Sequence, residues 1–293
     1  MGEFIRSLPQ KLIDDLKLES LYTNCLLQDI QLNKNAVFPA IRNNYISFYY
    51  KGGNIFNYSK SSFRTHMKYG VIPYKSKSPY IKEEDLADIA ILKNFSSAYS
   101  EIKNRCKLYG GKEAEYVSAL YTCSIAKKRK GIILLDTEIC FDSRNDNDLD
   151  PDTSNKKQNR IDILLYNIDS RQLCFCEAKH FSNSELWAKA GNKPKVCQQI
   201  KSYNGTIQNR SVEILNQYKE YVNKLNILFG TSLPVPESLF PETGLLLFGF
   251  DQTQREKIRK LLIEDNSLED INYYMTGQLK SNQISTLYNA ITK

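Results

Sequence analysis

Two apolar runs between residues 160 and 181 restrict the fold of this chain more than any other part of its sequence. The first run reads RIDILLYN and the second LCFCEAKHF, and a polar Asp-Ser-Arg-Gln sequence at 169–172 separates them. Branched and aromatic residues favour strands, and a short polar connection favours a hairpin. We therefore expect the two runs to form adjacent antiparallel strands in the interior of the protein.

Three charged residues interrupt these apolar runs: Asp162 in the first, and Glu177 and Lys179 in the second. Ionised side chains within buried strands are costly unless they pair or bind a metal. Because Glu177 and Lys179 are two residues apart, they share one face of a strand, while Ala178 points the other way and leaves its carbonyl oxygen for a ligand. Pairing of the two strands also brings Asp162 and Glu177 to one edge of the sheet.

Two carboxylates and a lysine in this arrangement suit the hydrolysis of a phosphodiester. A hard divalent cation held by carboxylates neutralises the nonbridging oxygens and lowers the pKa of the attacking water. We expect Asp162, Glu177 and the carbonyl of Ala178 to bind Mg²⁺, for which Mn²⁺ can substitute. Lys179 would then orient the water or help to deprotonate it. The alternative is a surface salt bridge on a strand, which contributes little to stability.

The sequence RID, fourteen residues, EAK and then a helical segment with Gln199 and Tyr203 resembles the PD-(D/E)xK nuclease superfamily. The Gln-x-x-x-Tyr element is similar to that of the RecB-type and phage exonuclease branches. The resemblance extends from residue 111 to residue 250. It implies an α/β fold with a restriction-endonuclease-like core of helix, three strands, helix and strand (αβββαβ), in which helices flank a central mixed sheet.

The resemblance also assigns roles to individual residues. Asp162 and Glu177 would be metal ligands, Lys179 the catalytic lysine, and Gln199 and Tyr203 a helix pair beside the substrate phosphate.

Family members often add a glutamate from the first core helix, and Glu113 and Glu115 are the candidates here, with Glu115 preferred. Acids near a helix start are also favoured by the helix dipole, without any catalytic role. Asp152 follows a proline, as in the family's name, but it lies in a polar segment at 142–160 that predicts a loop. Asp162, inside a strand, is therefore the expected ligand, although Ile161 replaces the proline of the motif.

The remaining pattern predicts a mixed sheet flanked by helices. The expected elements are helices at 83–131, 195–229 (with a break near Gly205) and 254–264, and strands at 132–141 and 244–250.

Residues 37–74 alternate apolar and polar residues and are crowded with tyrosine and phenylalanine. The glycine pair of Lys51-Gly52-Gly53-Asn54 permits a tight turn, so we expect a hairpin in which Tyr45–Tyr50 pairs with Ile55–Ser59. Interleaved aromatic and basic residues suit stacking and phosphate contact, although alternating aromatics also build small cores. We expect a smaller α+β domain at 1–95 that binds substrate or a partner, and a nuclease domain at 96–293.

Charge and composition are consistent with a nucleic-acid partner in the cytoplasm. The chain carries 40 basic and 33 acidic residues, and residues 1–100 hold 13 basic and 9 acidic side chains. Such a surplus is compatible with a polyanion. Seven cysteines without close pairing are typical of a reduced cytoplasmic protein, and two histidines exclude a histidine-rich metal centre. No run of 18 apolar residues is present, so we expect no membrane association.

The sequence therefore predicts a Mg²⁺-dependent nuclease, a metal-dependent phosphodiesterase that acts on DNA in phage defence, restriction or repair. Whether it is an endonuclease or an exonuclease stays open. Two alternatives stay open: an RNA substrate, or a catalytically inactive nuclease-fold module that binds nucleic acid or regulates another protein. A homodimer and a partner protein in a defence complex are also open.

Overall fold

Two β-sheets with helices packed against them organise the chain, which has a mixed α/β fold. The computed structural model describes residues 2–32, 37–70, 80–82, 94–123, 130–141, 160–188 and 192–293. The contacts divide the chain into two compact units. The first comprises Met1–Thr122, Cys140–Gln158 and Glu220–Ser232, and the second comprises Cys123–Ile139, Asn159–Lys219 and Leu233–Lys293.

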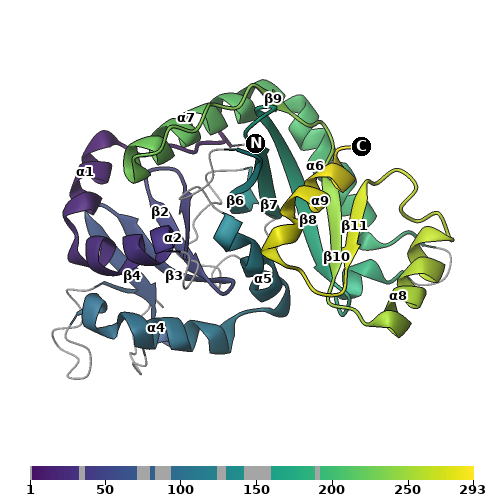
Figure 1. The fold of residues 1–293 in the computed structure, drawn as a ribbon, viewed down its shortest axis with the longest axis horizontal. Helices are drawn as coiled ribbons and strands as arrows, with labels where there is room; N and C mark the ends of the chain where they lie inside the picture. The colour runs from purple at the N-terminus through teal and green to yellow at the C-terminus, as the bar shows by residue number, and fades with distance from the viewer. Residues whose placement is uncertain are drawn as a thin grey trace. The chain divides into compact units, whose positions relative to one another are not determined.

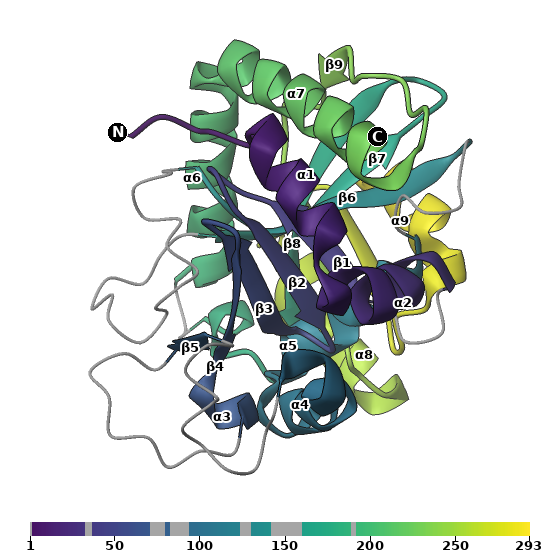
Figure 2. The ribbon, with the colours of Figure 1, turned by 90° about the vertical axis from the view of Figure 1, so that its left-hand side faces the viewer.

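The first unit contains a five-stranded antiparallel sheet in the order β1-β2-β3-β4-β5 (Figure 2). The expected aromatic hairpin is confirmed, because β2 pairs with β3 in a register that places Ile46 opposite Tyr58. Its turn needs a glycine: Gly52 has a φ of 81°, and an added Cβ would lie 2.4 Å from the backbone of Ala114. The strands are β1 (Phe38–Ile41), β2 (Ile46–Tyr50), β3 (Gly53–Ser59), β4 (Ser62–His66) and β5 (Tyr80–Lys82).

The helix α4 (Phe95–Tyr109) packs against this sheet, since Phe95 and Tyr99 place their rings 5.4 Å and 6.3 Å from that of Phe56. Asn94 caps the helix by accepting a hydrogen bond from the backbone of Ser97. The contacts therefore extend the first unit beyond residue 95, the predicted domain boundary. A functional division at residue 95 stays a prediction. The other helical segments are α1 (Gln10–Leu18), a π-helical turn (Tyr22–Leu26), α2 (Leu27–Leu32), α3 (Met67–Gly70), α5 (Lys112–Val117) and a 3₁₀ segment (Ser118–Cys123).

The second sheet has the order β11-β10-β8-β7-β6, and β9 also pairs with β8. The predicted hairpin at 160–181 is confirmed: β7 and β8 are antiparallel, with Ile163 opposite Cys176. β10 runs parallel to β8, so the sheet is mixed. The strands are β6 (Ile132–Cys140), β7 (Arg160–Asn167), β8 (Gln172–His180), β9 (Ser238–Leu239), β10 (Gly244–Phe248) and β11 (Tyr273–Thr276).

Helices cover both faces of β10 in the second unit (Figure 1). Leu245 and Leu247 join one buried cluster with residues of α6 and α8. On the opposite face, Gly244 lies so close to Ile291 of α9 that an added Cβ would be 2.4 Å from that side chain. Alternate residues of one strand thus pack against different helices. The helical segments are α6 (Lys195–Asn209), α7 (Ser211–Phe229), α8 (Gln252–Ile258), α9 (Ile284–Ile291), a π-helical turn (Arg259–Ile263) and 3₁₀ turns at Ser184–Leu186 and Ser281–Gln283.

The helical region at 195–229 differs from its prediction, because the chain breaks at Arg210 and not at Gly205. Gly205 lies inside α6, where a single glycine weakens a helix without ending it. The polar segment at 142–159 with Asp152, and the expected helical residues 83–93 and 124–129, lie outside the described residues. None of the helices in the described part of the chain has the length and apolar character needed to cross a membrane.

Candidate active site

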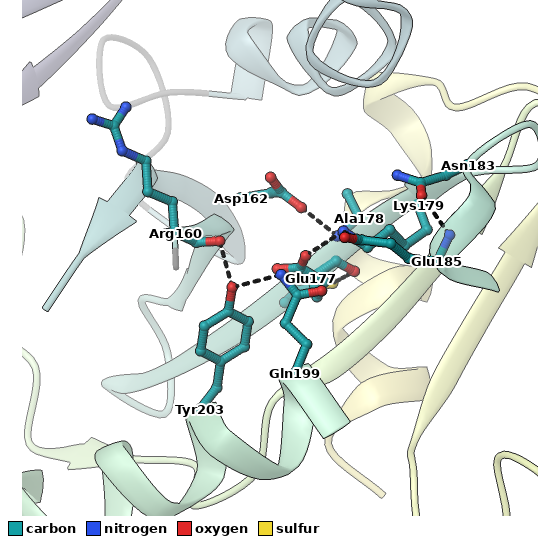
Figure 3. Close-up of polar contacts among 10 residues, drawn as sticks. Arg160, Asp162, Glu177, Ala178, Lys179, Asn183, Glu185, Gln199 and Tyr203 are labelled. Carbon is teal, nitrogen blue, oxygen red and sulfur yellow. Dashed lines mark hydrogen bonds and ion pairs between the residues drawn. The ribbon is translucent and has the colours of Figure 1, made fainter. Parts of the chain in front are cut away.

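The end of the β7–β8 pair brings the two expected acids together. Continuing the register that pairs Ile163 with Cys176 places Asp162 opposite Glu177, so both side chains project from the same face. The paired residues of the two strands end at Ile163 and Cys176, and beyond them the backbone N–H of Ala178 donates a 2.7 Å hydrogen bond to Oδ2 of Asp162 (Figure 3). The strands therefore separate where the acids lie, which leaves Asp162 at an open end of the ladder.

The parallel pairing with β10 decides which face of the sheet carries these side chains. Glu177 is paired with Leu245 and Lys179 with Leu247. Those leucines pack in the cluster that contains residues of α6, so the acid and the lysine face the same helix layer. Glu177 and Lys179 are only 1% and 5% exposed. Two charged residues are thus held in the interior, where each needs a partner.

Lys179 has two such partners. Its Nζ lies 2.7 Å from Oε1 of Glu177 and 3.0 Å from Oε2 of Glu185. Glu185 belongs to the short 3₁₀ turn after β8, and Asn183 fixes that turn by accepting a 2.9 Å hydrogen bond from the backbone of Glu185. The sequence reasoning missed Glu185. Asn183 is a typical capping residue and predicts a turn here, but nothing local shows that Glu185 reaches the lysine.

Gln199 and Tyr203 reach from α6 toward the strand that carries Glu177 (Figure 3). The hydroxyl of Tyr203 donates to the carbonyl of Arg160 at 2.7 Å and accepts from Nε2 of Gln199 at 2.9 Å. Because the hydroxyl proton is used on Arg160, the amide must present its N–H₂ group to the tyrosine. Oε1 of Gln199 is then a buried acceptor that has no hydrogen-bond partner among the described residues.

Burial and crowding perturb the ionisation of the site. Burial raises the pKa of Asp162 well above its usual range, and the negative charges of Glu177 and Glu138 raise it further. Lys179 offsets this only in part, because its ion pairs are made with Glu177 and Glu185. Burial lowers the pKa of Lys179, but the ion pair with Glu177 outweighs it, and the net direction is upward. Lys179 is therefore an ammonium cation at neutral pH.

The two carboxylates suit a divalent cation. Mg²⁺ is commonly bound through one or two carboxylates and keeps several waters, so Asp162 and Glu177 suffice as protein ligands. The backbone N–H of Ala178 donates to Asp162, and the role of the Ala178 carbonyl as a metal ligand stays a prediction. The described residues contain no cluster of three or more His, Cys, Asp or Glu side chains that could hold a metal.

Glu113 and Glu115 are on α5 in the first unit, where Glu115 is exposed, so their part in the site stays a prediction. His180 lies on the opposite face of β8, where its ring is 5.8 Å from that of Phe248. The structure thus brings together five of the expected side chains in the second unit: Asp162, Glu177, Lys179, Gln199 and Tyr203.

Searches of protein-family models, of curated proteins and of solved structures each return no match.

Proposed function

We propose that the second unit is a Mg²⁺-dependent nuclease that hydrolyses phosphodiester bonds of DNA. The observation that carries the proposal is the convergence of Asp162, Glu177 and Lys179 at the open end of the β7–β8 pair. An acid with a raised pKa beside a second acid and a buried cation is typical of a catalytic site. An ion pair with a purely structural role would be expected on the surface, where the desolvation free energy of its charges is smaller.

The order of elements supports the same proposal. β6, β7 and β8 follow one another, α6 comes next, and β10 then pairs in parallel with β8. The PD-(D/E)xK core that the sequence resembles has three strands, a helix and a strand in this order. A restriction-endonuclease-like core is therefore part of the proposal.

Each residue has a distinct role in the proposed reaction. Asp162, Glu177 and the carbonyl of Ala178 would hold Mg²⁺, which supplies charge neutralisation and a more acidic water. Lys179, held as a cation mainly by Glu177 and also by Glu185, would stabilise negative charge that develops on the phosphate. Gln199 would offer its buried oxygen as a hydrogen-bond acceptor to the attacking water.

Incubation of supercoiled plasmid with the full chain and Mg²⁺ or Mn²⁺ tests the proposal. We expect the wild type to cut the plasmid and Asp162→Asn and Lys179→Met to lose at least about 100-fold in rate, as is usual when a preorganised charge is removed. Lys195→Met removes an exposed lysine from the same unit and should keep full activity. Cleavage at the wild-type rate by Asp162→Asn would contradict the site assignment.

The same assay separates the alternatives that the sequence left open. A labelled RNA in a parallel reaction distinguishes the substrate. Comparison of closed circular DNA, which has no free ends, with linear DNA distinguishes internal from terminal cutting. Binding without cleavage under either metal would instead indicate an inactive nuclease-fold module. A role in defence, restriction or repair, a cytoplasmic location, and a homodimer or defence-complex partner stay predictions.

A further inference from the structure

A cavity of about 580 Å³ lies beside α6 in the second unit. Residues of two segments form its walls: 192–204, which lead into and begin α6, and 267–271, which precede β11. Its volume is within the range of about 300–1,000 Å³ that is typical of sites for small organic ligands. All of its lining residues belong to the described part of the chain. We call this space the α6 cavity.

The α6 cavity and the candidate active site lie on different sides of α6. Gln199 and Tyr203 point from the helix toward the active site (Figure 3). Cys197, Lys201 and Asn204 line the cavity, and their spacing of four and three residues places them on one stripe of the helix. Lys201 is turned by about 200° from both Gln199 and Tyr203, because each residue adds about 100°. The cavity is therefore separate from the candidate metal ligands.

Two lysines supply the positive charge of the α6 cavity: Lys193, which precedes α6, and Lys201 on the helix. Both are exposed, so a ligand can reach them. Among the residues that the structure describes, neither lysine forms an ion pair. Burial raises the pKa of the Cys197 thiol, and the charge of Lys193 lowers it in part. The ammonium of Lys193 thus lies near the wall of the cavity.

An amide and two isoleucines add neutral contacts to the α6 cavity. Oδ1 of Asn204 accepts a 2.7 Å hydrogen bond from the backbone N–H of Thr243, which leaves the N–H₂ group of the amide as a donor for a ligand. Ile200 belongs to the buried cluster between the sheet and α6, and Ile271 packs against that cluster. The cavity therefore combines an oriented donor with an apolar surface, which is typical of ligand pockets.

One acid, Asp270, lines the wall that precedes β11. In the described structure it forms no ion pair with Lys193 or Lys201, so charges of opposite sign are held apart in the cavity. Three other acids of this segment do not line the cavity: Glu264, Asp265 and Glu269. A ligand that contacts both walls therefore has an anionic group at one end and hydrogen-bond donors at the other.

We propose that the α6 cavity binds a free ribonucleoside monophosphate. Lys193 and Lys201 pair with the phosphate, since two ammonium groups match its charge of about −1.5 to −2. Asp270 accepts hydrogen bonds from the ribose hydroxyls, and Ile200 and Ile271 contact the base. A ligand with a single carboxylate would leave one of the two lysines without a counter-charge. This site shares no residue with the candidate active site, so it does not rest on the proposed nuclease activity.

Equilibrium dialysis of the full chain against labelled AMP, in EDTA so that no metal-dependent reaction occurs, tests this proposal. We expect saturable binding of one AMP per chain. Lys193→Met/Lys201→Met should weaken binding at least about tenfold, because it removes charge-assisted hydrogen bonds. The control Lys260→Met/Lys280→Met removes the same charge from exposed positions of the same unit and should bind like the wild type. All four lysines are exposed, so both variants should unfold close to the wild-type temperature.

Two related ligands test the two ends of the nucleotide separately. 2′-DeoxyAMP should bind the wild type about tenfold more weakly than AMP, because it loses a hydrogen bond to a charged acceptor. Asp270→Ala lacks that acceptor and should bind both nucleotides equally. Adenosine lacks the phosphate and should bind the wild type at least about tenfold more weakly than AMP, whereas Lys193→Met/Lys201→Met should bind adenosine and AMP alike.

Several outcomes would overturn the proposal. They are an absence of saturable binding at up to about 1 mM AMP, equal AMP binding by the two double variants, and binding of inorganic phosphate as tight as that of AMP. Displacement of AMP by a 5′-phosphorylated oligoriboadenylate at a lower concentration than by AMP itself would assign the cavity to the end of a nucleic acid instead. Asp162→Asn should bind AMP like the wild type even if it cannot cut plasmid, so failure of one proposal is distinguishable from failure of the other.

Discussion

Replacement of Lys179 by methionine tests the electrostatics of the candidate site directly. The ammonium lies 2.7 Å from a carboxylate that is 1% exposed, and its own side chain is 6% exposed. Removing one partner of a buried ion pair typically costs 3–5 kcal/mol, because the other charge is left without compensation. Glu177 can limit that cost by taking up a proton, so we expect the low end, about 3 kcal/mol. For domains of this size class, 1 kcal/mol shifts Tm by about 2–4 °C, which gives a decrease of about 6–12 °C.

Thermal unfolding in EDTA at pH 7.5, followed by circular dichroism, measures this decrease. Lys195→Met, which removes an exposed lysine, should melt within about 1 °C of the wild type, since such surface changes have small effects. If Lys179→Met and Lys195→Met unfold at the same temperature, then Lys179 does not compensate the charge of a buried carboxylate. The electrostatic account of the site is then wrong.

Addition of Mg²⁺ gives a second measurement on the same variant. A ligand that binds only the folded state raises its stability, and a divalent cation beside Glu177 would also replace the missing ammonium. We therefore expect Mg²⁺ to raise the Tm of Lys179→Met more than that of the wild type. An equal rise in both proteins would show that the cation and the lysine do not share a carboxylate.

Three further predictions concern the second unit. Burial and neighbouring acids raise the pKa of Asp162, so the folded state binds more protons than the unfolded state. The folded state therefore loses stability as the pH rises above the usual Asp pKa of about 4. In EDTA, Asp162→Asn should melt at a higher temperature than the wild type at pH 8 and at the same temperature below about pH 4. Tyr203→Phe removes a hydroxyl that accepts a hydrogen bond from Gln199, so it should lower the free energy of unfolding by about 1–2 kcal/mol in urea titrations. An unchanged free energy of unfolding would mean that water replaces the hydroxyl in the variant. Gly249 has a φ of 76°, and an added Cβ would lie 2.1 Å from the His180 ring, so Gly249→Ala should cost about 1–3 kcal/mol in the same assay.

The sequence by itself determined the local elements whose pattern is periodic. The apolar runs at 160–181 predicted the β7–β8 hairpin, and the Gly52-Gly53 pair predicted the β2–β3 turn; both are present. These predictions succeed because strand alternation and turn geometry depend on neighbouring residues only. The same periodicity placed Glu177 and Lys179 on one face, and the spacing of Gln199 and Tyr203 placed both on one side of a helix.

Only the tertiary structure decided which distant groups complete these elements. Glu185 reaches Lys179 because a capped turn folds back after β8, and Arg160 accepts from Tyr203 because α6 packs over the end of β7. Pairing of β5 with β4 likewise joins two segments whose partnership no local pattern encodes. Contacts between segments far apart in sequence are selected by the burial of whole faces, so they follow from the packing of the complete sheet and its helices.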